Sequence, residues 1–286
     1  SLLRTVDIQK LVNAIGKNYD IDSDAEITLE ANPGTVDAFY LRQLRAVGVN
    51  RLSLGMQSLH EEELALLGRS HTSDEARRSV SQAREAGFDN LSLDFIYGIP
   101  GRRLPDWDTM LNDIVSLGVD HLSLYGLTLE DDSPLGIAVS RGEIPAIDPD
   151  AAASEYELAA QKLDLAGYRQ YEISNWAHPG AESRHNLVYW RRGEYLGLGA
   201  AAHSFINGQR IANRDSLDDY LSALAVGELP RCEVENIDLP TALSEAIILG
   251  MRLNDGVYLD DIERQFSIDL LSRFKIEIAE LSSLGL

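Results

Sequence analysis

Three polar side chains, Glu30, Gln57 and Asp94, end three separate segments of the sequence that are otherwise rich in leucine. Small or polar residues stand two positions before each one, as Thr28 does before Glu30. Alternate residues of a strand share a face, so such spacing predicts strands with one polar face. Carboxylates and amides at the carboxyl ends of parallel strands are typical of ligand sites. We therefore expect a hollow, polar interior with room for a polar ligand, or alternatively a few buried hydroxyls bonded to backbone.

A single cysteine, Cys232, limits the metal chemistry of the chain. One thiol excludes an internal disulfide, a cysteine-rich zinc site and an iron–sulfur cluster ligated by this chain alone. Cys232 lies far beyond the polar strands, and we interpret it as an incidental thiol.

Four copies of one pattern supply the elements that position the polar residues. Each copy is an amphipathic segment, a glycine and an apolar strand, with the helical segments at about 35–47, 74–86, 105–117 and 150–166. The glycines that can end these helices in a left-handed conformation are Gly48, Gly87, Gly118 and Gly167. Helix and strand therefore alternate, which predicts a parallel sheet in an α/β barrel or an open doubly wound sheet.

Composition narrows the possible partners. The chain has 286 residues, 44% of them hydrophobic, and a formal net charge of −21. The acidic balance argues against nucleic acid, and no apolar run reaches the ~20 residues of a membrane span. No signal peptide opens the sequence at Ser1, so we expect a cytoplasmic protein that is not an integral membrane protein.

Ordered blocks along nearly the whole chain resemble one known family. The blocks are residues 27–34 (ITLEANPG), 50–58 (NRLSLGMQS), 67–72 (LGRSHT), 93–101 (LDFIYGIPG), 168–175 (YRQYEISN) and 184–190 (RHNLVYW). They resemble the radical S-adenosylmethionine superfamily, in the branch of oxygen-independent coproporphyrinogen III oxidase and the HemW-like heme chaperones. The resemblance implies an α/β fold, a partial (β/α)6 TIM-like barrel whose first two strands are absent here.

The resemblance also implies which residues hold S-adenosylmethionine. Glu30 matches the carboxylate at the amino-acid end of that cofactor, and Arg69 matches the cation that pairs with its carboxylate. Gln57 and Asp94 match polar ligands of the methionine and ribose parts. A zwitterion requires one anion and one cation, and a ribose diol requires an acceptor, so these residue types suit the cofactor.

The HNxxYW stretch at 185–190 resembles the motif of the heme chaperones. Imidazole is a good axial ligand of heme iron, and aromatic neighbours can shield a macrocycle. His185 is therefore the candidate heme ligand that the resemblance implies, with His203 as second choice.

The family's CxxxCxxC loop, which binds a [4Fe–4S] cluster, is missing from this sequence. Ser1 resembles the residues that follow the family's next glycine-rich turn, so we expect a chain that is incomplete at its N-terminus. We assign no catalytic residue and no cluster ligand, and expect the cluster only in the full-length family member.

Three parts are expected along the chain: a partial radical S-adenosylmethionine barrel at 1–135, an extension that carries HNxxYW at 136–225, and a truncated helical, winged-helix-like domain at 226–286. Helices are expected from Thr241, over 259–266 and over 269–284. Residues 233–286 contain 11 acidic and 4 basic residues, a net charge of −7, which argues against DNA.

Three functions remain open at this point. The first is a heme-binding chaperone that delivers heme to acceptor proteins. The second is an enzyme of porphyrin biosynthesis like coproporphyrinogen III oxidase. The third is a degenerate, non-catalytic binding scaffold.

Overall fold

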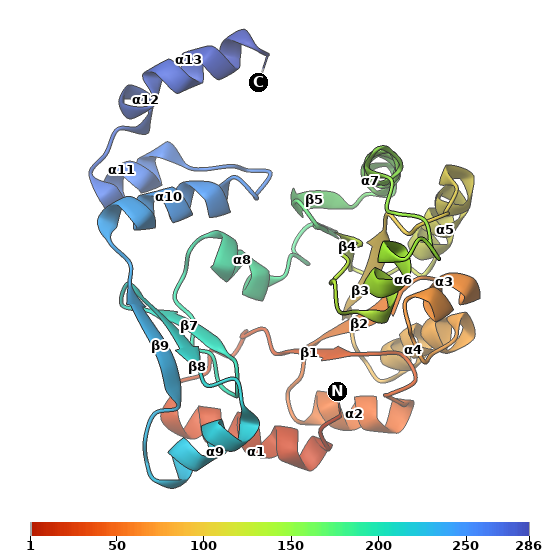
Figure 1. The fold of residues 1–286 in the computed structure, drawn as a ribbon. Coiled ribbons are helices and arrows are strands. Elements are labelled where there is room, and N and C mark those ends of the chain that lie inside the picture. The colour runs from red at the N-terminus through yellow and green to blue at the C-terminus, as the bar shows by residue number, and fades with distance from the viewer. Residues whose placement is uncertain (1, 286) are drawn as a thin grey trace. The chain divides into compact units, whose positions relative to one another are not determined.

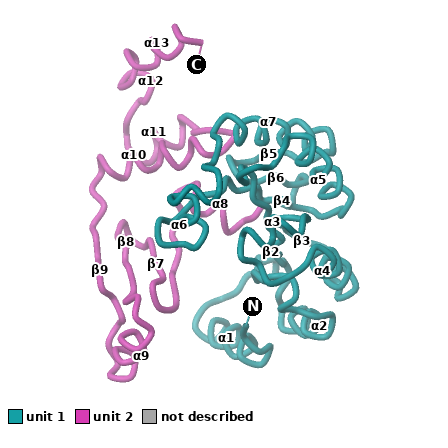
Figure 2. The backbone as a smooth tube through the Cα atoms, turned by 45° about the vertical axis from the view of Figure 1, so that its right-hand side comes forward, with its two compact units in different colours: residues 1–182 teal, residues 183–286 magenta. Residues whose placement is uncertain are grey.

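The computed structural model describes residues 2–285, which fold as two compact units, residues 2–182 and 183–285 (Figures 1 and 2). Each unit contains its own sheet. The finer division of the chain at residues 135 and 225 stays a prediction. Within residues 2–285 no helix is both long and apolar enough to cross a membrane.

The sheet of unit 1 has six strands in the order β1-β2-β3-β4-β6-β5. The strands are β1 (Thr28–Ala31), β2 (Arg51–Gln57), β3 (Asn90–Tyr97), β4 (His121–Gly126), β5 (Arg169–Glu172) and β6 (Asn175–Ala177). β1 to β4 are parallel neighbours, which confirms the prediction from the repeats. The sheet has two free ends among the described residues, so it is the open, partial form of the barrel rather than a closed one.

The β6 strand departs from the predicted pattern because it is antiparallel to both β4 and β5. It has three residues and follows β5 after only two, so a parallel crossover, which needs a dozen or more residues, cannot form there. β5 and β6 thus form a hairpin at one end of the sheet, where the repeats predicted a single strand.

The predicted helices of unit 1 are confirmed to within a few residues, and three more accompany them. They are α1 (Thr5–Asn18), α2 (Ala38–Ala46), α3 (Glu61–Leu66), α4 (Ser73–Glu85), α5 (Leu104–Ser116), α6 (Pro134–Ser140) and α7 (Pro149–Leu165). A capping box between Thr72 and Glu75 opens α4. Gly48, with φ of +100°, follows α2 in the left-handed conformation that the sequence pattern requires.

The apolar core of unit 1 lies between the leucine face of the sheet and its helices. Leu52, Leu54, Leu91, Leu93 and Leu122 are fully buried there. Burial of one such side chain contributes about 1.5–3 kcal/mol, so this face drives the helices onto the sheet. The opposite face is thereby left to the polar residues.

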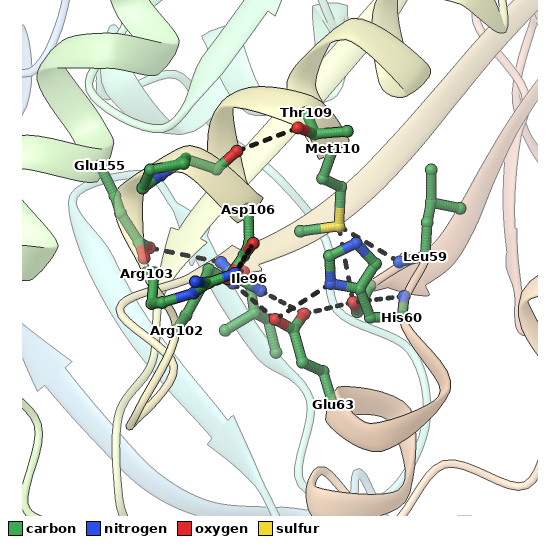
Figure 3. Close-up of polar contacts among 12 residues, drawn as sticks. Leu59, His60, Glu63, Ile96, Arg102, Arg103, Asp106, Thr109, Met110 and Glu155 are labelled. Atoms are coloured by element: carbon green, nitrogen blue, oxygen red, sulfur yellow. Dashed lines mark hydrogen bonds and ion pairs between the residues drawn. The ribbon is translucent and has the colours of Figure 1, made fainter.

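A buried ionic cluster holds the loop after β3 (Figure 3). The Arg102 guanidinium donates to Glu63 of α3 at 2.6 Å and to Glu155 of α7 at 3.3 Å, and also to the carbonyl of Ile96 at 3.1 Å. Its side chain is 1% exposed. Burial raises the pKa of Glu155. Burial also acts to raise the pKa of Glu63, but the hydrogen bonds and charge of Arg102, together with the hydrogen bond from Ser58, outweigh it and lower that pKa. One cation therefore joins two helices to the end of β3.

Unit 2 combines a small sheet with helices. Its elements are α8 (Arg184–Trp190), β7 (His203–Ile206), β8 (Gln209–Asn213), α9 (Leu217–Ala225), β9 (Arg231–Asn236), α10 (Leu239–Gly250), α11 (Leu259–Phe266), α12 (Leu270–Arg273) and α13 (Lys275–Ser283). β7, β8 and β9 form an antiparallel sheet, and α10 to α12 share a second apolar core.

Two helix predictions in unit 2 need correction. α10 starts at Leu239, because the Asp238 carboxylate caps it by accepting the backbone N–H of Thr241 at 2.9 Å. The predicted helix over 269–284 is two helices, since Phe274 (φ −107°, ψ 26°) interrupts the helical backbone between α12 and α13.

Candidate functional site

A cavity of about 460 Å³ opens on the polar face of the unit 1 sheet. It is lined by Leu2, Glu30, Ala31, Asn32, Thr35, Ser53, Gly55, Gln57, Arg69 and Asp94. All four residues that the resemblance assigns to S-adenosylmethionine are among them. The registers of the parallel strands bring them together, since Glu30 pairs with Ser53, and Gly55 pairs with Asp94. The predicted hollow interior is therefore present at this level of the sheet.

Below the cavity, the polar face is filled by side chains that bond to one another. Ser92 Oγ lies 2.8 Å from His121 Nδ1, and His121 Nε2 lies 2.9 Å from the hydroxyl of Tyr171. Burial, together with the nearby Arg51, lowers the pKa of His121 well below its ordinary value. The two expectations for the polar face thus apply to different parts of the sheet. Buried, hydrogen-bonded side chains fill the amino-terminal half of the strands, and the cavity lies at the carboxyl-terminal half.

Asp94 lies deeper in the site than the sequence suggests. It is the fifth residue of β3, not its end, because pairing with β4 continues to Tyr97. Ser53 Oγ lies 3.2 Å from both carboxylate oxygens. Burial raises the pKa of Asp94 to about 6, against the hydrogen bonds from Ser123 and Ser53 that lower it. The carboxylate is ionised at neutral pH and can accept hydroxyl donors from a ligand.

Gly55 and Gln57 shape the floor of the cavity. A Cβ added at Gly55 would lie 2.9 Å from Asn32 Oδ1 and 2.9 Å from Gln57 Nε2, so the space beside Gly55 is already filled by these two amides. Gln57 has φ of +66° at a register shift, a conformation that costs a side-chain-bearing residue about 1–2 kcal/mol. Strained backbone of this kind clusters at functional sites.

Arg69 reaches the cavity from the segment between α3 and α4. Its backbone N–H donates to Leu64 at 2.8 Å, and the buried His71 lies 3.1 Å from the carbonyl of Met56 on β2. These bonds anchor the segment to β2. Both Arg69 and Glu30 are exposed, so the cavity has one cation and one anion at its rim and a carboxylate further in.

Asn32 and Thr35 line the cavity but were absent from the predicted set. Asn32 stands two residues after Glu30, so the same alternation that identifies Glu30 could have identified it. Thr35 follows a turn in which its N–H and hydroxyl both donate to the Asn32 carbonyl, at 3.1 and 2.7 Å. A turn of this kind leaves no periodic signal.

His185 belongs to unit 2, in the first turn of α8. The imidazole is exposed and meets the ring of Tyr189, one helical turn later, edge to face at 4.8 Å and 86°. The other candidate, His203, is exposed at the start of β7. Both candidate histidines therefore lie at exposed positions of unit 2.

Cys232 lies on β9 of unit 2, exposed, with Sγ 3.3 Å from the carbonyl of Asn213. A [4Fe–4S] cluster takes its ligands from several thiolates, and this chain has one. The residues of this chain thus do not fit that cluster.

The parallel strands with a polar cavity toward their carboxyl ends define an α/β ligand-binding protein. Residues 4–114 match the model of the radical SAM superfamily, and residues 237–286 match that of the HemN C-terminal domain. The solved coproporphyrinogen III oxidase (HemN) of Escherichia coli superposes with a TM-score of 0.81 at 23% identity, covering 99% of this chain and 68% of that one. At that identity the likeness shows the fold alone.

Curated relatives give the finer assignment. Heme chaperone HemW of Bacillus subtilis (strain 168) is 33% identical over 280 residues, which cover 98% of this chain and 74% of the relative. HemW of Mycobacterium tuberculosis (strain CDC 1551 / Oshkosh) is 37% identical over 259 residues, covering 91% of this chain and 66% of the relative. The chain belongs to the HemW family of radical SAM proteins.

Proposed function

We propose that this chain binds heme through His185, as a heme chaperone that passes heme to acceptor proteins. The observation that carries the proposal is the exposed His185 on α8, backed by Tyr189, in a chain 33% identical over 98% of its length to a protein named a heme chaperone. The oxidase alternative has support from the fold alone, and no described residue favours it.

We also propose that the unit 1 cavity holds S-adenosylmethionine. Glu30 takes the ammonium group, Arg69 takes the carboxylate, and Asp94 accepts the ribose hydroxyls. The amides of Gln57 and Asn32 cover the floor. When bound, the cofactor supplies a sulfonium whose reductive cleavage requires an electron donor; the residues described here bind and orient it.

The heme proposal predicts the effect of His185→Ala. Hemin titration of the unaltered chain should give a red-shifted Soret band from an imidazole ligand, and His185→Ala should lose that shift, because the side chain that ligates the iron is gone. His203→Ala is the matched control and should titrate like the unaltered chain. Identical Soret changes in the chain and in His185→Ala would show that His185 is not the ligand.

The cofactor proposal predicts the effect of Gly55→Ala. The added methyl group would displace the amides of Asn32 and Gln57, both of which line the cavity. Calorimetric titration with S-adenosylmethionine should therefore show an affinity at least about tenfold weaker, which corresponds to ~1.4 kcal/mol. Gly16→Ala is the control, since its Cβ would meet only Ile21 at an ordinary 3.6 Å. Equal affinity in both variants would contradict the proposed position of the cofactor.

A further inference from the structure

A second cavity, of about 360 Å³, lies within unit 2 beside the HNxxYW helix. Its walls include the rings of Tyr189, Tyr195 and Phe205. Tyr189 meets Tyr195 edge to face at 4.6 Å, and backbone hydrogen bonds of 2.9 Å in both directions join Tyr195 to Phe205. Tyr189 is also the ring that backs His185. One aromatic side chain therefore joins the candidate heme ligand to this cavity, since residues four apart share a face of a helix.

Two arginines enter the same cavity. Arg192 follows α8, and Arg210 lies on β8. Both pair with Glu245 of α10: Arg192 Nε donates at 2.9 Å, and Arg210 donates through a terminal nitrogen. Burial acts to raise the pKa of Glu245, but the hydrogen bonds from the two arginines outweigh it and hold that pKa below its ordinary value. Glu245 is thus a fixed anion that orients both guanidinium groups.

Arg192 has donors left over. Its guanidinium lies 4.5 Å from the Phe205 ring centroid, and its side chain is 10% exposed. Only Nε has a hydrogen-bond acceptor among residues 2–285, so both terminal nitrogens retain their donors. Its backbone is also strained, with φ of +52°, in the tight turn where Gly193 N–H donates to Val188 at 2.7 Å. Such strain persists where the surrounding structure imposes it.

We infer that this cavity binds a carboxylate arm of the flat, anionic macrocycle whose metal His185 ligates, with Arg192 as the principal donor. The inference rests on the proposed heme function and adds a specificity site to it. Aromatic walls suit the apolar edge of a macrocycle, and a guanidinium with two free terminal nitrogens suits bidentate pairing with a carboxylate. Arg210 pairs with Glu235 at 3.2 Å on its exposed side and plays a secondary part.

The test uses the full chain and metal-free porphyrins, which remove iron ligation from the measurement. Protoporphyrin IX is titrated against its dimethyl ester, and porphyrin emission is followed. The chain should bind the diacid at least about tenfold more tightly than the ester, and Arg192→Met should remove that preference. Arg192→Lys keeps the positive charge but loses the bidentate geometry of the guanidinium, so it should retain part of the preference for the diacid. Arg191→Met removes an exposed arginine from the preceding position and should leave the preference for the diacid unchanged.

The outcomes separate this inference from the heme proposal. Equal affinity of the unaltered chain for the diacid and the ester would overturn the proposed carboxylate site. So would an Arg192→Met variant whose affinities for the diacid and the ester fall by the same factor. A Soret shift that depends on His185, together with diacid binding that does not depend on Arg192, overturns the inference alone. If the preference for the diacid depends on Arg192 while His185→Ala leaves the Soret shift with hemin unchanged, the carboxylate site is supported and His185 is rejected as the heme ligand.

Discussion

Replacing Arg102 by methionine is expected to lower the free energy of unfolding of unit 1 by about 3–5 kcal/mol, the range found when one partner of a buried ion pair is removed. The variant leaves the carboxylates of Glu63 and Glu155 without their shared cation, at 13% and 3% side-chain exposure. Urea unfolding followed by tryptophan fluorescence measures this directly, because the Arg102 guanidinium lies 4.7 Å from the Trp107 ring centroid.

The neighbouring arginine supplies the control for that experiment. Arg103 is 77% exposed and pairs with Asp106 within the same turn, so Arg103→Met should cost no more than ~1 kcal/mol. Adding Glu63→Gln and Glu155→Gln to Arg102→Met should restore part of the loss, because no uncompensated carboxylate then remains. A stability of Arg102→Met equal to that of Arg103→Met would show that the cluster in Figure 3 contributes no net stability.

Replacing Asp94 by asparagine is expected to stabilise the fold at pH 8. The pKa of Asp94 is about 6, against an ordinary value of 3.8, so the folded chain holds this proton more tightly than the unfolded chain does. Ionisation of Asp94 therefore lowers the free energy of unfolding. This loss is small below about pH 4, grows as the pH rises, and is nearly complete above about pH 6. A shift of roughly two pKa units corresponds to about 3 kcal/mol, which sets the upper limit of the gain in Asp94→Asn.

The pH dependence distinguishes this effect from a general change in packing. The difference in unfolding free energy between Asp94→Asn and the unaltered chain should shrink as the pH falls from 7 to 4. Asp89→Asn, at an exposed position just before β3, should show no such trend. A pH-independent difference at Asp94 would contradict the assignment. The expected gain implies that the carboxylate is retained for a ligand and not for the fold.

Periodicity predicted the parts of the site that lie on regular strands. Glu30, Ser53 and Asp94 share the polar face because alternate residues must do so, and the leucines opposite them are buried as expected. Arg69 reaches the cavity from an irregular segment, which no periodicity places, and only the family resemblance identified it. The cluster of Glu63, Arg102 and Glu155 draws on three distant segments, and nothing in the spacing of these residues predicts that they meet.

The lone thiol on β9 makes the chain suitable for attachment of a single fluorophore. Cys232 is exposed in unit 2, the unit that also contains His185. A maleimide dye at this position would be the only one on the chain, and heme is an efficient energy acceptor for visible emission. Quenching of such a dye would then report both arrival of heme and its later departure to an acceptor protein, in real time and without any change to the proposed heme-binding residues.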